Sequence, residues 1–283
     1  MKRIFLEDAI TETVTITGKD ANHLANALRA KKGDRIIAVD KFGNTAVIEF
    51  TAFTGNAIHA KTVGEIKNVA HSETIKILKT VGRAGELETH TRGDETIFAK
   101  RVTLADCLPK QNKFDTIVEK ATELGVDRLE PLISDRTIAR PGNFRAKSKL
   151  ERWNRVAKEA AEQCARDTLP EIGSIREIAD WLKEIAPSLG RFKDKNFNGK
   201  GALLLFFNEK ETAANLPEIL HAYKNCDCDK NIILLIGPEG GFSEREAREI
   251  KAAGGVSVSL GKRILKTDTA AISALAIVQY EMS

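Results

Sequence analysis

Short segments in which hydrophobic and polar residues alternate dominate the first 70 residues of the chain. Three of these segments predict β-strands, at residues 35–40, 46–50 and 57–63, and glycine-containing turns separate them. Apolar residues at helical spacing predict one helix at residues 20–30. We therefore expect residues 1–70 to form a small β-barrel with one early helix.

Strand-like and helix-like patterns alternate from about residue 102 onward. Residues 202–207 and 232–236 are unbroken apolar runs, which are typical of parallel strands covered on both faces. Residues 114–124 and 153–164 carry apolar side chains at helical spacing. This alternation predicts an α/β domain in which helices cross over between the strands of a parallel sheet.

The length of 283 residues independently predicts about two domains. We place the first domain at residues 1–70 and the second at residues 71–283. Residues 71–100 are polar and contain three glycines, so this segment is a linker, an insertion or part of the first domain.

The composition is that of a globular protein, with 42% hydrophobic and 30% charged residues. No apolar run reaches the roughly 18 residues that a membrane-spanning helix needs. The N-terminal segment turns acidic at Glu7, before the apolar core of a signal peptide. We therefore expect a cytoplasmic protein. The four cysteines include no Cys-x-x-Cys pair, and Cys226 and Cys228 stand too close together for a zinc knuckle, so we expect free thiols and no metal site.

Basic residues are concentrated in two places, although the formal net charge is only +4. Residues 136–158 contain eight Lys or Arg residues and one acidic residue, Glu151, which gives a local net charge of 8 − 1 = +7. A second cluster lies at residues 29–35. Two basic patches on a nearly neutral chain favour binding of a polyanion such as RNA. A solvated helix face and an ordinary turn would give the same pattern.

The sequence Gly-Pro-Glu-Gly-Gly at residues 237–241 directly follows the apolar run 232–236. Ser243 and Glu246 have the spacing of a capping box, which predicts that a helix begins right after the turn. The turn is neither a phosphate-binding P-loop nor a Gly-x-Gly-x-x-Gly motif. Glu239 within it would repel a phosphate and would tolerate a cationic cofactor. The alternative is an ordinary strand–helix connection.

A second glycine turn lies close behind the first. A short strand is predicted at residues 256–260, a turn begins at Gly261, and a helix begins near Thr267 or Asp268. Two strand-to-helix turns would bring main-chain groups to the carboxyl edge of a parallel sheet, where the ligands of such sheets bind. Glycines allow a ligand to approach the main chain closely.

The segment IGPEGGFSE at 236–244, followed by SLGKRILKTDTAA at 259–271, resembles the RsmE family of the SPOUT methyltransferases. Other stretches that resemble this family are LPK at 108–110, KATELGV at 120–126, PLISDR at 131–136, KLERW at 149–153 and KEAAEQC at 158–164. The front of the chain resembles the family's small PUA-like RNA-binding domain, on the residues RIF at 3–5, ANHL at 21–24, LR at 28–29 and GD at 33–34.

This resemblance implies an α/β protein with a small N-terminal PUA-like β-barrel and a C-terminal SPOUT domain that contains a deep trefoil knot. It implies S-adenosylmethionine as the cofactor, held in a bent form by the knot loops, and a homodimer formed through the knotted domain. The family methylates N3 of one uridine, uracil-1498, in 16S rRNA of the small ribosomal subunit. The cofactor-binding residues that the resemblance implies are Phe207, Asn208, Ile236, Gly237, Pro238, Glu239, Gly240, Leu260, Gly261, Ile264, Leu265, Lys266 and Thr267.

The chemistry of uracil indicates roles for the charged side chains of these turns. N3 carries a proton and is a poor nucleophile until that proton leaves, whereas methyl transfer from a sulfonium mainly requires alignment. Our hypothesis is that Lys266 or Arg263 stabilises the uracil anion, and that Glu239 or Asp268 accepts the proton or orients the cation. The alternatives are solvated loop cations and, for Asp268, a helix N-cap. The family usually has Arg and Glu in place of Lys266 and Asp268, and Lys replaces a forked guanidinium imperfectly.

We expect the target uridine to be bound within folded RNA, by basic side chains that contact phosphates and set the register. Two alternatives stay open: a knotted methyltransferase that acts on transfer RNA, and an inactive RNA-binding factor of ribosome assembly. The PUA-like front favours ribosomal RNA over transfer RNA, and the intact glycine turns favour an enzyme. The predicted RNA-binding residues are Arg3, Arg29, Lys31, Lys32, Arg35, Arg136 and Arg140.

Overall fold

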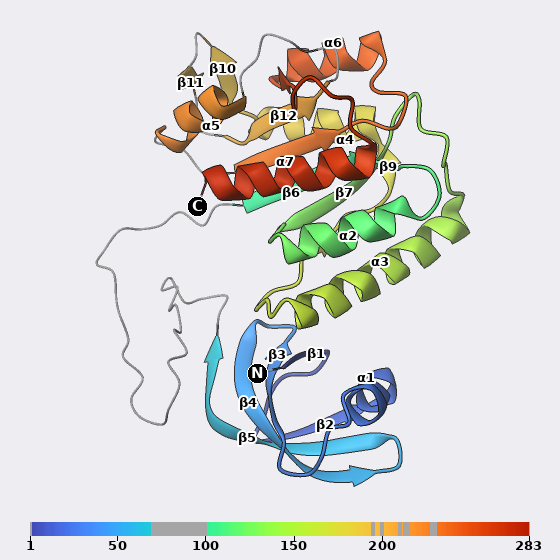
Figure 1. Cartoon of the computed structure of the whole chain (residues 1–283), viewed down its shortest axis with the longest axis vertical. Coiled ribbons are helices and arrows are strands. Elements are labelled where there is room, and N and C mark those ends of the chain that lie inside the picture. Colours follow the sequence, from blue (N-terminus) through green and yellow to red (C-terminus); the bar gives the residue numbers. More distant parts are fainter. Residues whose placement is uncertain are drawn as a thin grey trace. The chain divides into compact units, whose positions relative to one another are not determined.

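The computed structural model describes residues 2–68, 101–193, 196–198, 201–208, 211, 216–226 and 231–282. The chain divides into two compact units, Met1–Phe98 and Ala99–Ser283 (Figure 1). The predicted domain boundary near residue 70 and the segment 71–100 lie outside the described residues.

The N-terminal unit contains a five-stranded sheet of order β1-β3-β4-β5-β2. β1 pairs with β3 in parallel, and the other pairs are antiparallel. Alternate side chains of the strands form the core, which includes Ile48, Phe50 and Ile58. The three predicted strands are confirmed, and two short edge strands complete the sheet. The strands are β1 (Arg3–Leu6), β2 (Thr13–Thr17), β3 (Arg35–Asp40), β4 (Asn44–Thr54) and β5 (Ala57–Asn68).

The helix predicted at residues 20–30 begins earlier and ends earlier than the apolar spacing indicated. It consists of α1 (Gly18–Asn22) and a π-helical turn, η1 (His23–Ala27). Arg29 follows with a φ of 49°, in the left-handed region, and this conformation ends the helical segment.

The C-terminal unit is built on a seven-stranded sheet of order β14-β12-β13-β6-β7-β8, in which β9 also pairs with β7. Every pair in this sheet is parallel, as the unbroken apolar runs predicted. The strands of the sheet are β6 (Arg101–Cys107), β7 (Arg128–Ile133), β8 (Glu171–Ile172), β9 (Arg176–Glu177), β12 (Leu203–Phe207), β13 (Asn231–Ile236) and β14 (Val256–Val258). A separate antiparallel hairpin consists of β10 (Arg191–Lys193) and β11 (Asn196–Asn198).

Helices cover both faces of the parallel sheet (Figure 1). Ile232, Leu234 and Ile236 of β13 share one apolar cluster with residues of α2, α5 and α7. Ile233 and Leu235 share the other cluster with residues of α4 and α6. The apolar run in β13 therefore has no polar face, because the side chains on both faces of the strand are buried. The helices are α2 (Lys113–Glu123), α3 (Asn143–Gln163), α4 (Ile178–Ile185), the 3-10 turn η2 (Ala186–Ser188), α5 (Leu216–Lys224), α6 (Glu244–Ala253) and α7 (Thr267–Glu281).

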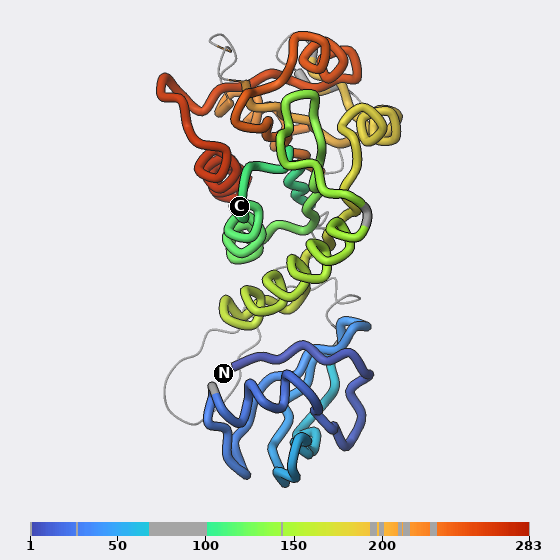
Figure 2. Tube along the Cα trace, turned by 90° about the vertical axis from the view of Figure 1, so that its right-hand side faces the viewer, coloured from blue at the N-terminus to red at the C-terminus, as the bar shows by residue number. Residues whose placement is uncertain are grey.

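The carboxyl ends of four strands lie side by side at one edge of the sheet. In the pairing register, Ile236 of β13 is level with Phe207 of β12 and with Asp106 of β6. Phe207 is in turn level with Val258 of β14. The turns that follow β13 and β14 therefore begin at the same edge, and Figure 2 traces the second of them into α7 (red).

Within the described residues, no helix is long and apolar enough to span a membrane. No group of three or more His, Cys, Asp or Glu side chains in this part of the chain is arranged to hold a metal ion. Cys107 and Cys164 are free thiols. Cys226 is disulfide-bonded, so the expectation of a free thiol was wrong at this position.

Candidate active site

A cavity of about 780 Å³ opens at the carboxyl edge of the parallel sheet. Three segments form most of its wall: the end of β12 at 207–208, the first glycine turn at 236–243, and the second glycine turn at 259–267. Its volume is in the range of ligand-binding clefts in proteins.

The structure brings every predicted cofactor-binding residue to this one cavity. They come from three separate stretches of sequence: Phe207 and Asn208; Ile236, Gly237, Pro238, Glu239 and Gly240; and Leu260, Gly261, Ile264, Leu265, Lys266 and Thr267. Of the four predicted catalytic residues, Glu239, Arg263 and Lys266 also line the cavity. Asp268 is not among the lining residues and lies in the first turn of α7.

The first turn is shaped by its glycines and by the helix that follows. The Gly241 N–H donates to the Pro238 carbonyl at 2.8 Å, and Gly241 has a φ of +66°. Helix α6 then begins with the predicted capping box. The Ser243 hydroxyl accepts the Glu246 N–H at 3.2 Å, and a Glu246 carboxylate oxygen accepts the Ser243 N–H at 2.8 Å.

The second turn leads directly into α7. Gly261 has a φ of +107°, a conformation that favours glycine. Lys266 is the N-cap residue and has an extended backbone, and α7 begins at Thr267. Asp268 therefore lies inside the first turn, where a carboxylate interacts favourably with the helix dipole, and the N-cap alternative does not apply to it. Its Oδ1 atom is 3.8 Å from Lys113 Nζ.

A buried carboxyl group that the sequence analysis missed lies beside these turns. Asp106, near the end of β6, is 0% exposed, and neither of its oxygens has a hydrogen-bond partner in the described structure. Burial raises the pKa of Asp106 well above its usual value, and the negative charges of Glu239 and Asp268 raise it further. The signal in the sequence was an acidic residue within the mostly apolar stretch 104–108.

The basic residues predicted to bind RNA differ in how strongly they contact the rest of the protein. Arg29, Lys31, Lys32 and Arg35 are all exposed, and Arg35 pairs with Glu49 at 2.7 Å. Arg3 is half-buried.

The other two predicted RNA-binding residues lie in the segment between β7 and α3. Arg140 donates to the Ser134 carbonyl at 2.8 Å and pairs with Glu177 at 3.0 Å. Arg136 lines the cavity and donates to the Gly240 carbonyl at 2.6 Å. Both therefore make contacts within their own unit.

Two family models match the chain. The model for an RNA methyltransferase domain matches residues 97–279, and the model for an RNA methyltransferase PUA domain matches residues 16–63. The parallel sheet with its two glycine turns is thus an RNA methyltransferase domain, and the β-rich unit contains a PUA domain.

Relatives that match most of the chain define the family more narrowly than the two domain models do. The ribosomal RNA small subunit methyltransferase E of Synechocystis sp. is 32% identical over 270 residues, which cover 95% of this chain and 74% of the relative. The protein of the same name from Bacillus subtilis is 26% identical, over 99% of this chain and 97% of the relative. The crystal structure of the Neisseria gonorrhoeae protein, bound to S-adenosyl methionine, matches with a TM-score of 0.73 and 25% identity, over 99% and 97% of the two chains. The chain belongs to the ribosomal RNA small subunit methyltransferase E family.

Proposed function

We propose that this protein transfers the methyl group of S-adenosylmethionine to N3 of uracil-1498 in 16S ribosomal RNA. The observation that carries the proposal is the cavity formed by the two glycine turns, in a member of this family. The Neisseria gonorrhoeae relative, whose structure holds S-adenosyl methionine, supports the choice of cofactor.

The cavity wall suits a cofactor that is bound mainly through main-chain groups. A Cβ atom at Gly237 would lie 3.2 Å from the Phe242 ring, and one at Gly240 would lie 3.4 Å from Cδ of Arg136. The first distance is tighter than an ordinary contact and the second is an ordinary one, and because both glycines line the cavity, side chains here would narrow it. The exposed carboxylate of Glu239 is compatible with a sulfonium cation and would repel a phosphate. The residues at 237–240 and 260–267 would hold the cofactor.

When bound, the cofactor would supply a methyl group on a positively charged sulfur. The protein's own side chains would then remove the N3 proton of uracil and stabilise the anion. The N3–H bond breaks as the proton passes to a carboxylate, and N3 takes the methyl group as the carbon–sulfur bond breaks. Lys266 and Arg263 are exposed at the cavity, where a cation would offset the charge that develops on the uracil ring. Of the two predicted proton acceptors, only Glu239 lines the cavity, which favours Glu239 over Asp268.

The assembly of the enzyme is also part of the proposal. Helix α7 buries Ala271, Ala274, Leu275 and Val278, and Tyr280 on the same helix is 81% exposed. An exposed aromatic ring on the last helix fits a homodimer formed through the methyltransferase domain. The strand order, in which β12 lies between β13 and β14, is compatible with a deep trefoil knot. We propose that the protein works in the cytoplasm on the small ribosomal subunit.

Calorimetric titration with S-adenosylmethionine tests the cofactor site. The wild-type protein should bind, and Gly240→Val should lose binding because a branched side chain at this cavity-lining position would occupy space that the cofactor needs. Gly142→Val is the matched control, since no atom lies within 4 Å of a Cβ at Gly142 and its φ is −68°. Equal loss in both variants, or none in Gly240→Val, would contradict this site.

A methylation assay tests the substrate. Small subunits that lack the modification should be methylated at one uridine, which mass spectrometry of nuclease fragments locates. Methylation of transfer RNA instead would support the first alternative. Binding of small subunits without any methyl transfer would support the inactive assembly factor.

A further inference from the structure

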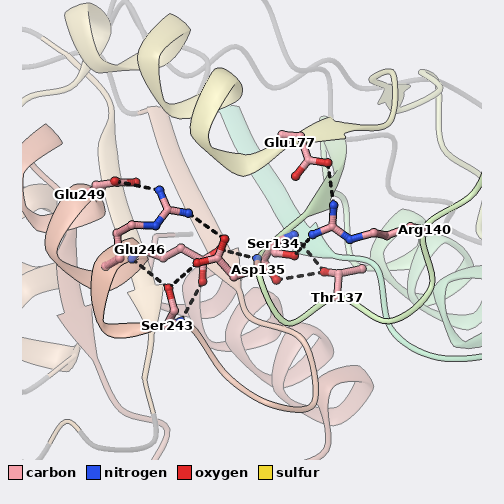
Figure 3. A network of polar contacts seen from close by, with 9 residues as sticks. Ser134, Asp135, Thr137, Arg140, Glu177, Ser243, Glu246 and Glu249 are labelled. Carbon is pink, nitrogen blue, oxygen red and sulfur yellow. Dashed lines mark hydrogen bonds and ion pairs between the residues drawn. The ribbon is translucent and has the colours of Figure 1, made fainter.

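One buried carboxylate joins the cofactor turn to a segment more than a hundred residues earlier. Glu246, in the first turn of α6, is 2% exposed. Its Oε2 atom accepts the Ser243 N–H at 2.8 Å, and its Oε1 atom accepts the Asp135 N–H at 2.8 Å. The start of α6 and the segment after β7 therefore share a single anchor (Figure 3).

The Asp135 side chain reinforces this anchor. Its Oδ2 atom accepts the Ser243 hydroxyl at 2.7 Å (Figure 3). Its Oδ1 atom accepts Arg245 Nη2 at 2.7 Å. Arg245 is itself held by Glu249 at 3.0 Å. The hydrogen bond from Ser243, together with Arg245, lowers the pKa of Asp135 below its usual value. Asp135 thus stays ionised and keeps both contacts.

The other side of the segment after β7 is held just as firmly. The Ser134 N–H donates to the Thr137 hydroxyl at 2.9 Å, and both residues are buried. Arg140 donates to the Ser134 carbonyl at 2.8 Å and pairs with Glu177. Residues on either side of Arg136 are therefore fixed, which fixes where the side chain of Arg136 begins.

Arg136 reaches from this fixed segment to the cofactor turn. Its Nη1 atom donates to the Gly240 carbonyl at 2.6 Å, and its Cδ and Cβ atoms lie 3.4 and 3.5 Å from the position of a Cβ at Gly240. A hydrogen bond from a charged donor to a main-chain carbonyl is among the stronger ones in proteins. The contact orients the peptide group of Gly240 at the cavity wall.

We propose that Arg136 is a positioning residue for the cofactor turn, held in place by the Asp135–Glu246 network. The inference rests on the proposed function of that turn. It assigns Arg136 a role different from the phosphate contact predicted from its charge. The guanidinium already donates to a carbonyl of its own unit.

The first experiment needs no ligand. Hydrogen exchange of the amides at 237 and 239–243 should become faster in Arg136→Ala than in the wild type, because the Gly240 carbonyl loses its donor. Arg145→Ala is the matched control: Arg145 is an exposed cation on α3, and its removal should leave exchange in the turn unchanged. Unchanged exchange in Arg136→Ala would overturn the inference, whatever the protein binds.

The second experiment separates positioning from RNA binding. Arg136→Ala should weaken S-adenosylmethionine binding by about tenfold. It should leave unchanged the salt dependence of small-subunit binding.

Added guanidinium ion should partly restore the cofactor affinity of Arg136→Ala. The cofactor affinity of Arg136→Lys should lie between those of the wild type and Arg136→Ala. Asp135→Asn should add little to the loss in the Arg136→Ala background, because both act through one contact. Normal cofactor affinity combined with a smaller salt slope would instead make Arg136 a phosphate contact. If the wild type does not bind S-adenosylmethionine, the proposed function fails, and the exchange experiment still decides the inference.

Discussion

The Oε1 atom of Glu239 accepts a hydrogen bond of 2.9 Å from the main-chain N–H of Lys110. Lys110 follows β6, and Glu239 lies in the turn after β13, the neighbouring strand. The carboxylate is therefore oriented by a main-chain N–H group, which neither titrates nor changes rotamer. This arrangement is well suited to a residue that must accept a proton at a fixed place.

The substitution Glu239→Gln distinguishes a role of Glu239 in proton transfer from a role in the structure of the turn. Glutamine keeps an oxygen that can accept the Lys110 N–H, so cofactor affinity should stay close to that of the wild type. The turnover rate should fall by about 100-fold or more, because the variant has no carboxylate to accept the proton. Glu239→Ala should lose both turnover and part of the cofactor affinity. Full turnover by Glu239→Gln in a single-turnover methylation assay would exclude Glu239 as the proton acceptor.

Lys266→Ala tests the stabilisation of the uracil anion. Removal of one cation from the cavity should lower the turnover rate by about 100-fold, and Lys266→Arg should restore most of it. Lys251→Ala removes an exposed cation on α6 outside the cavity and serves as the control. A turnover rate in Lys266→Ala equal to that of Lys251→Ala would shift this role to Arg263.

Asp106 should make the stability of the protein depend on pH. The pKa of Asp106 is raised in the folded protein. The contribution of this group to the free energy of unfolding is therefore fully present below pH 3.8, its ordinary pKa. The contribution is lost as the pH rises towards the folded pKa, at up to about 1.4 kcal/mol per pH unit. Asp106→Asn removes the ionisation, so the unfolding free energy of the variant should increase relative to wild type between pH 4 and the raised pKa. Chemical denaturation of both proteins at several pH values measures the difference. A difference in unfolding free energy that does not change with pH would mean that folding does not raise the pKa of Asp106.

The basic residues of the N-terminal unit should differ in their effect on RNA binding. Lys31 and Lys32 are exposed, so their joint replacement by Ala should reduce the salt slope of small-subunit binding by about 1.5. Arg35→Ala should reduce the slope by less than half of this amount, because Glu49 already offsets the charge of Arg35. Filter binding at several salt concentrations gives the slopes. The reverse order would place the RNA on the β3–β4 face that carries Arg35.

The features that the sequence predicted well are those set by local pattern. The capping box of Ser243 and Glu246 needs only a spacing of three residues, and the parallel sheet needs only unbroken apolar runs. The cavity residues were found through family motifs, which carry tertiary information that periodicity lacks. The contact between Arg136 and Gly240 spans 104 residues, and no local pattern encodes such a pair. The charge of Arg136 therefore suggested only an RNA contact, and nothing in the local sequence pattern singled out Asp106 as part of a site.

The shared anchor at Glu246 also has a consequence for the time at which the protein becomes active. Asp135 and Glu246 are 111 residues apart, so translation delivers them to the folding chain at well-separated moments. Strand β7 can form early, but the main-chain N–H of Asp135 finds its acceptor, the Glu246 carboxylate, only when α6 has left the ribosome. A nascent chain that stops before α6 would retain much of the parallel sheet and would have no shaped cavity. The newly made polypeptide thus acquires its site only after α6 has been synthesised.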